Sequence, residues 1–95
     1  MSQEILEKTP DSAETKPYPN YRVLLLNDNH NTFEHIETCL TKHVPGMSRD
    51  KAHQLALKVR NDGVAVVWVG PKEVAEMYYE LLKSEGLTVT IEPDI

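Results

Sequence analysis

The sequence is poor in the features that mark several large classes of protein. It has 95 residues and one cysteine, Cys39, so an internal disulfide is excluded and a reducing compartment is favoured. Its apolar runs fall far short of the ~20 residues that span a bilayer, and its start lacks the cationic and apolar regions of a secretory signal. A formal net charge of -5 argues against binding to nucleic acid or to an anionic membrane. We therefore expect a single small domain that binds neither.

Patterns for catalysis and metal binding are also scarce. Cys39 lies inside a predicted helix rather than at an activating N-terminus, and no glycine-rich loop could cradle a phosphate. His35, Cys39 and His43 are spaced four apart, which can place three ligands on one helix face. A structural zinc site usually has four ligands, and only His30 in the preceding loop could contribute another. We predict no enzyme, no cofactor and no metal, with a metal site as the rival hypothesis.

Residues 1–20 differ in composition from the rest of the chain. They mix charged residues with prolines, and only Ile5 and Leu6 offer apolar surface. This is too little to offset the conformational entropy lost on ordering the segment. We predict a flexible or extended N-terminal extension, either a passive leader or an arm that engages a partner, followed by one domain over residues 21–95.

Hydrophobic periodicity predicts six elements in that domain. Ser48 is expected to cap the second helix and Gly63 to end it in the left-handed conformation. Trp68 lies in a strand with two apolar faces, so either both are covered or Trp68 is partly exposed. The predicted class is α+β, a β-α-α-β-α-β domain with a three-stranded antiparallel sheet and three helices on one face. The expected strands are 21–27, 64–69 and 87–92, and the expected helices are 32–44, 48–62 and one beginning at Pro71.

The segment that follows the first predicted strand is unusually polar. A buried run, 23–26, leads into Asn27-Asp28-Asn29-His30-Asn31. Asn31 and Glu34 fit a capping box at the start of the first helix. Such a row can orient a polar ligand beside a helix N-terminus, but Asn and Asp also cluster where they only satisfy one another in a tight turn.

Four segments, in this order, resemble the ClpS family of adaptors, which pass proteins with certain N-terminal residues to a Clp-type AAA+ unfoldase. Residues 21–28 are similar to the family's strand that runs into Asn-Asp-Asp. Residues 52–63 are similar to its helix pattern Ala-x-x-x-Met-x-x-Val-His-x-x-Gly. Glu73-Val74-Ala75-Glu76 matches Glu-Val-Ala-Glu, and the last strand begins at Leu87. The alternative is an interaction domain unrelated to this family.

The resemblance implies a pocket for the first residue of a substrate. The positions that would hold the α-ammonium are Asn27, Asp28, Asn29, Asn31 and Arg60. The positions that would line the apolar pocket are Phe33, Ile36, Ala56, Val59 and Leu87. The family has Asp, Thr and His where this chain has Asn29, Asn31 and Arg60, and Met where it has Phe33 and Ala56.

The change from His to Arg60 has the largest chemical consequence, because Arg carries only donors and a permanent charge. Arg60 could repel an ammonium, pair with Asp28 or turn to solvent. Two hypotheses follow. In the first, the chain is an N-degron adaptor whose pocket favours Leu over bulky rings. In the second, it has lost recognition of the free α-amine and binds another ligand, such as a blocked or acidic chain end.

The resemblance also implies a partner and a location. Glu73 and Glu76 match the family's surface for docking on the N-terminal domain of a ClpA- or ClpC-type unfoldase. Tyr78 takes the place of a lysine in that surface, although the apolar stripe could instead bury it. Substrates would be proteins with bulky hydrophobic N-terminal residues. We expect a monomer that acts in a bacterial cytoplasm or a plastid stroma.

Overall fold

The computed structural model describes residues 19–95, and its elements follow the predicted order of strand, helix, helix, strand, helix, strand. The prediction for residues 1–18, a flexible extension, lies outside the described residues. None of the helices between residues 19 and 95 combines the length and the apolar character needed to cross a bilayer. The elements are β2 (Tyr21–Leu26), α1 (Phe33–His43), α2 (Arg49–Asp62), β3 (Val64–Gly70), α3 (Lys72–Ser84) and β4 (Val89–Pro93).

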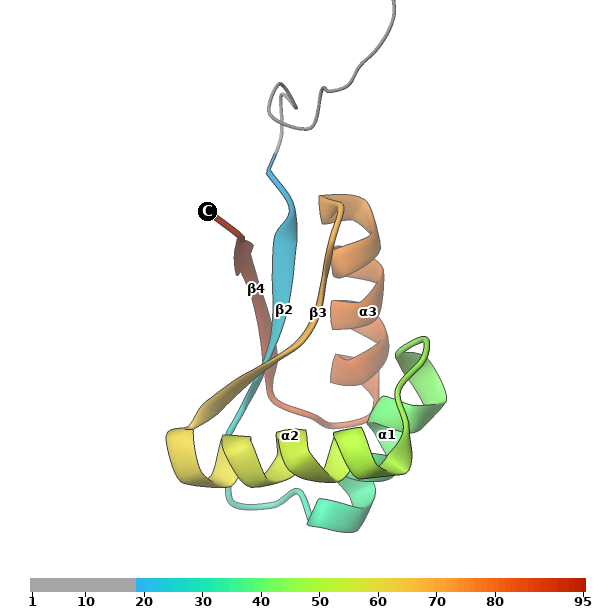
Figure 1. The fold of residues 1–95 in the computed structure, drawn as a ribbon, viewed down its shortest axis with the longest axis vertical. Helices are drawn as coiled ribbons and strands as arrows, with labels where there is room; N and C mark the ends of the chain where they lie inside the picture. The colour runs from blue at the N-terminus through green and yellow to red at the C-terminus, as the bar shows by residue number, and fades with distance from the viewer. Residues whose placement is uncertain (1–18) are drawn as a thin grey trace, which may run out of the picture.

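The three strands form one antiparallel sheet, which confirms the predicted class, and their order in the sheet is β3-β2-β4. In β2, Val23 and Leu25 are fully buried between the sheet and the helices. Helix α3 runs along the sheet and contacts all three strands, whereas α2 crosses its lower end (Figure 1). On β3, Val64, Val66 and Val69 are 36–43% exposed. The helices therefore cover one face of the sheet, and β3 keeps an open face.

An irregularity in β3 explains the place of Trp68. Val23 pairs with Trp68 while its neighbour Leu24 pairs with Val66, so Val67 is an extra residue in β3. Such a bulge locally changes the direction of the side chains. Val67 and Trp68, although adjacent, both pack on the core, and the Trp68 ring lies 4.9 Å from that of Tyr78 on α3.

The helix ends follow local rules, with some corrections. Ser48 caps α2 by accepting from Lys51 N, and Gly63 ends the helix at φ +86°, both as predicted. The predicted cap of α1 is wrong, because Thr32 rather than Asn31 accepts from a backbone N–H, that of His35. Helix α3 begins at Lys72 rather than at Pro71 as predicted, because Pro71 is the residue just before its first turn. Strand β4 begins at Val89, two residues later than predicted.

Candidate functional site

The polar loop, defined here as residues 27–32, lies at the end of the molecule where α2 ends and β4 begins (Figure 1). Two backbone hydrogen bonds hold its start: Leu26 N donates to Thr88 O at 2.8 Å, and Asn27 N donates to Gly63 O at 3.0 Å. The loop is therefore fixed on one side by the segment leading into β4 and on the other by the last turn of α2, which carries Arg60.

Asp28 is the centre of this loop. Its Oδ1 accepts from the backbone N–H groups of His30 (3.0 Å) and Asn31 (2.9 Å). Its Oδ2 accepts from the Asn31 side-chain amide and from the Thr88 hydroxyl, both at 2.7 Å. A carboxylate offers about four acceptor positions, so these contacts occupy all of them. Asp28 thus organises the loop and acts on any ligand through its charge rather than through a further hydrogen bond.

That charge persists over the whole range of physiological pH. Partial burial by itself raises the pKa of the Asp28 carboxyl, but the hydrogen bonds from Thr88, Asn31 and the His30 backbone outweigh it and hold the pKa well below its usual range. The loop therefore presents a permanent negative charge beside the end of α2.

The three loop asparagines differ in their exposure and in the hydrogen bonds that their side chains make. Asn31 donates its amide to Asp28 and to Gly86 O at 3.0 Å, so its remaining polar atom is the carbonyl oxygen. Asn27 and Asn29 are exposed. Amide oxygens accept hydrogen bonds, which an ammonium group can donate. The loop therefore carries neutral acceptors next to a fixed negative charge, a combination suited to a cationic group.

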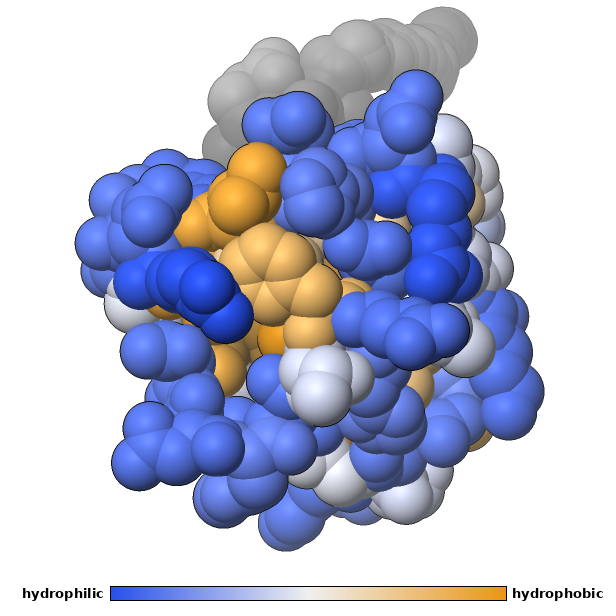
Figure 2. Space-filling view, turned by 90° about the horizontal axis from the view of Figure 1, so that it is seen from below, coloured by the Kyte–Doolittle hydropathy of each residue, from blue (hydrophilic) through white to orange (hydrophobic). Residues whose placement is uncertain are grey.

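The five predicted pocket positions all belong to the hydrophobic core or pack against it. Ile36 from α1, Ala56 and Val59 from α2, and Leu87 before β4 all belong to one buried cluster, and each is at most 7% exposed. Phe33 packs against this cluster but remains partly exposed. Seen from the same end, the surface shows an apolar patch surrounded by hydrophilic residues (Figure 2). An apolar patch therefore lies at the same end of the molecule as the polar loop.

Arg60 is exposed to solvent, one of the three possibilities that the sequence left open, and it also makes a contact that the sequence did not indicate. Its guanidinium carbon lies 4.3 Å from the centre of the Phe33 ring, a cation–π contact. His53, on the same helix, meets the same ring edge-on, with 5.8 Å between the ring centres. Sequence reasoning missed this use of Arg60 and missed His53, Thr88 and Gly86 altogether. Their partners lie in other elements, so no local signal could have indicated them.

The predicted docking residues separate into two environments. Glu73 and Glu76 are exposed on the first turns of α3. Tyr78 is instead only 8% exposed and packs against Trp68. Its side chain is therefore part of the core, the second of the two alternatives left by the sequence, and it cannot belong to a docking surface in this fold.

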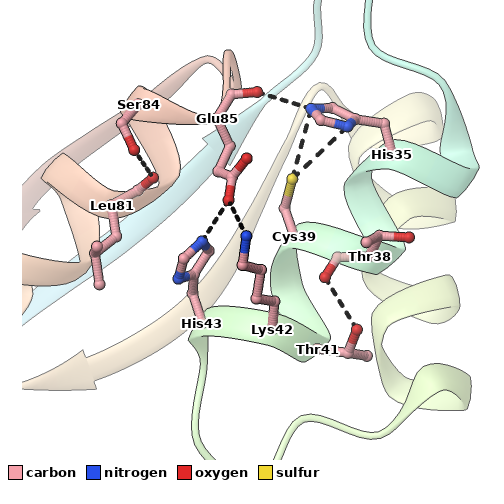
Figure 3. A network of polar contacts seen from close by, with 9 residues as sticks. All are labelled: His35, Thr38, Cys39, Thr41, Lys42, His43, Leu81, Ser84 and Glu85. Carbon is pink, nitrogen blue, oxygen red and sulfur yellow. Dashed lines mark hydrogen bonds and ion pairs between the residues drawn. The ribbon is translucent and has the colours of Figure 1, made fainter.

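The rival metal site on α1 has another explanation (Figure 3). His43 Nε2 and Lys42 Nζ lie 2.7 and 3.1 Å from Glu85 Oε2, and these contacts hold the pKa of Glu85 below its usual range. His35 Nε2 lies 2.8 Å from the Glu85 backbone oxygen and 3.5 Å from Cys39 Sγ. Burial raises the pKa of the Cys39 thiol. Within residues 19–95, no three His, Cys, Asp or Glu side chains are placed to hold a metal. The network joins α1 to the end of α3 instead.

Known proteins resemble this chain over most of its length. A family model described as "ATP-dependent Clp protease adaptor protein ClpS" matches residues 16–90. The ClpS adapter of Synechocystis sp. is 51% identical over 84 residues, which cover 85% of this chain and 86% of that protein. The ClpS adapter of Gloeobacter violaceus is 45% identical and is covered to 99%, as is this chain. Chloroplastic CLPS1 of Arabidopsis thaliana is 35% identical over 99% of this chain and 64% of its own length.

A solved structure shares the fold. The structure of Agrobacterium tumefaciens ClpS2 bound to L-phenylalaninamide superimposes with a TM-score of 0.72 at 30% sequence identity. The match covers 80% of this chain and 98% of that one.

Proposed function

Because the chain belongs to the ClpS family of adaptor proteins of the ATP-dependent Clp protease, we propose that it binds the first residue of a substrate protein and presents that protein to a Clp unfoldase. The observation that carries the proposal is the solved relative: ClpS2, with the same fold, was bound to L-phenylalaninamide, an amino acid with a free α-amine and a blocked carboxyl group. That ligand has the chemistry of a protein's first residue.

The polar loop would bind the ammonium group of that residue. The amide oxygens of Asn27, Asn29 and Asn31 accept hydrogen bonds, and Asp28 supplies a negative charge that its internal hydrogen bonds keep ionised. At about 4 Å and an effective dielectric constant near 20, one such charge attracts an ammonium by roughly 4 kcal/mol before solvation losses. Arg60, in the last turn of α2, opposes this attraction with a charge of the same sign as the ammonium.

The side chain of the first residue would enter the apolar cluster of Ile36, Ala56, Val59 and Leu87. The aromatic ring of Phe33 would narrow the approach, while Ala56, shorter than the Met that the family has there, would leave more room below. A narrow entrance over a deeper floor suits a slender aliphatic side chain such as Leu better than a bulky ring. The expected order of affinity is therefore Leu above Phe, Tyr and Trp.

The handover to the unfoldase would use the other end of the molecule. Glu73 and Glu76 offer an exposed acidic surface for the N-terminal domain of a ClpA- or ClpC-type unfoldase. The adaptor would act as a monomer. Three of the named relatives come from cyanobacteria and a chloroplast, which favours a bacterial cytoplasm or a plastid stroma as the place of action.

One observation favours a second candidate function. All acceptor positions of Asp28 are used inside the loop, and the nearby cation Arg60 would repel a free amine. A site with these properties suits a blocked or acidic chain end, to which Arg60 could donate. In that case the chain would modulate which substrates reach the protease without reading a free N-terminus.

Fluorescence-anisotropy titrations with matched peptides would distinguish the two functions. The peptides begin with Leu, Phe, Tyr or Trp and carry either a free or an acetylated N-terminus. We expect the free Leu peptide to bind most tightly and acetylation to weaken binding at least about tenfold, equivalent to about 1.4 kcal/mol. Preference for the acetylated peptides would overturn the N-degron proposal in favour of the second function.

Absence of binding to either set would also overturn it for this chain. The double variant Arg60→His with Asn29→Asp then serves as a control for the scaffold. Recovery of free-amine binding by this variant would locate the loss at those two positions and leave the pocket itself intact.

A further inference from the structure

The Phe33 ring is held between two side chains of α2. The Arg60 guanidinium lies over its face, 4.3 Å from the centroid, and the His53 ring approaches at 77° with 5.8 Å between centroids. Residues 53 and 60 are two helical turns apart on one side of α2, about 10 Å along its axis. They therefore restrain the ring from two directions, while the buried cluster restrains it from below.

His53 is itself fixed by a neighbour on α1. Its Nδ1 lies 2.6 Å from Glu37 Oε2, and the other oxygen of Glu37 accepts from Arg49 Nε at 3.1 Å. The Glu37 side chain is only 12% exposed, whereas His53 and Arg49 are 47% and 52% exposed, so these contacts restrain His53 modestly. His53, one of the two side chains that restrain Phe33, is thus itself held by Glu37 of α1, which also contacts Arg49 of α2.

The contacts have a preferred geometry. A cation is attracted to the negative face of an aromatic ring, and a second ring prefers an edge-to-face approach. Both attractions weaken if the Phe33 ring rotates away. The ring is therefore more restrained than a methionine would be at this position, since methionine has three rotatable bonds and no ring face.

From this arrangement we propose that Arg60 and His53 are positioning residues that hold Phe33 as a fixed gate at the entrance of the apolar pocket, and so determine which first residues enter. The inference rests on the proposed function and deepens it. In this role Arg60 acts on the choice of side chain, in addition to the repulsion between its charge and the α-ammonium, which is common to all first residues.

The first test compares wild type and Arg60→Gln with free-amine peptides that begin with Leu, Phe and Trp. Loss of the cation frees the Phe33 ring, so binding of the Phe and Trp peptides should improve about twofold to fivefold relative to the Leu peptide, the range that one cation–π contact represents. A change by the same factor for all three peptides, with their affinity ratios unaltered, would overturn the proposal, because it would mean that Arg60 acts only on the common ammonium group.

Three matched variants separate positioning from a general structural effect. Arg60→Lys keeps the cation and should retain the wild-type ratio of Leu to Phe affinity. His53→Gln keeps a polar partner for Glu37 but removes the ring, so the ratio should shift in the same direction as in Arg60→Gln. In a Phe33→Met background, Arg60→Gln should leave the ratio unchanged. A shift of equal size in that background would exclude the ring as the mediator.

A second measurement tests the contact between Phe33 and Arg60 without any ligand. It therefore applies even if the wild-type protein binds no free amine and the proposed function fails. A double-mutant cycle with Phe33→Leu and Arg60→Gln measures their coupling in urea unfolding. We expect the two changes to couple by about twofold to fivefold in the unfolding equilibrium constant. Additive effects of the two substitutions would show that the contact restrains nothing, which would overturn the gate.

Discussion

At the scale of single residues, Asp28 has the most consequential environment. Its carboxylate receives hydrogen bonds from two backbone N–H groups of its own loop and from the Asn31 and Thr88 side chains. Thr88 is 60 positions away in the sequence. Asp28 therefore joins the polar loop to the start of β4, and the loop keeps its shape without a ligand. A site that is organised in advance loses less entropy on binding.

We expect Asp28→Asn to lower the free energy of unfolding by about 1–3 kcal/mol at pH 7, since hydrogen bonds to a charged acceptor are lost. An amide nitrogen would face two donors, the Asn31 amide and the Thr88 hydroxyl. The pKa of Asp28 is lowered in the folded state, so its stabilisation is fully present above the ordinary carboxyl pKa of about 4 and is lost as the pH falls below it. Urea unfolding between pH 7 and pH 3 measures this.

The difference in the free energy of unfolding between wild type and Asp28→Asn should therefore become smaller as the pH falls. Asn29→Ala, at the exposed neighbouring position, is the control and should change stability by less than about 0.5 kcal/mol at any pH. A gap that stays constant from pH 7 to pH 3 would contradict the assignment of the stabilisation to the ionised carboxylate.

At the scale of elements, the bulge in β3 links the sheet to α3. It turns Trp68 toward Tyr78, and past the bulge Gly70 becomes a buried position. The Trp68 ring lies where a side chain at 70 would be: a Cβ atom built on Gly70 would approach the ring to 2.2 Å. The glycine is therefore needed to leave room for the Trp68 ring, and the reason is space rather than backbone conformation.

Gly70→Ala should destabilise the protein by about 1–3 kcal/mol through overpacking. Because Trp68 is the only tryptophan, its displacement should also shift the intrinsic fluorescence of the folded state. Gly46→Ala is the matched control: open space surrounds it but its φ is +71°, so it should cost about 1–2 kcal/mol of backbone strain with unchanged fluorescence. Unchanged emission in Gly70→Ala would mean that the ring does not restrict this position.

At the scale of the whole molecule, the candidate binding site and the acidic start of α3 lie at opposite ends of the sheet. Tyr21 pairs with Gly70 just before α3, whereas Leu26 pairs with Val64 next to the polar loop. Six residues of β2 separate these ends, about 20 Å of extended chain. A substrate and an unfoldase could therefore occupy the adaptor together without direct contact at either site.

Glu73→Lys should weaken binding to the isolated N-terminal domain of a Clp unfoldase about tenfold or more and leave peptide affinity unchanged, because the residue is far from the loop. Biolayer interferometry measures the first quantity and anisotropy the second. Asp50→Lys is the control, since Asp50 is likewise an exposed acid in the first turn of a helix, α2. Equal weakening by both variants would attribute the effect to net charge instead of a docking surface.

The sequence by itself determined the features that depend on neighbours in the chain. Alternation and apolar runs specified the strands and helices in their order, and Ser48 and Gly63 marked the ends of α2, because caps and turns depend on the conformations of a few adjacent residues. The prediction of Asn31 as the cap is wrong because the adjacent Thr32 can fill the same role. In the structure Thr32 accepts from His35 N, while the Asn31 amide donates to Asp28 and to Gly86.

Tertiary structure decided the features that join distant parts of the chain. The Thr88 hydroxyl donates to Asp28, and the Trp68 ring packs against Tyr78. The Arg60 guanidinium contacts the Phe33 ring instead of pairing with Asp28. The free energies of these contacts depend on the relative positions of whole elements, which local patterns do not encode. The chemistry available at the site was thus readable from residue types, whereas the partner that each of these residues takes was set by packing.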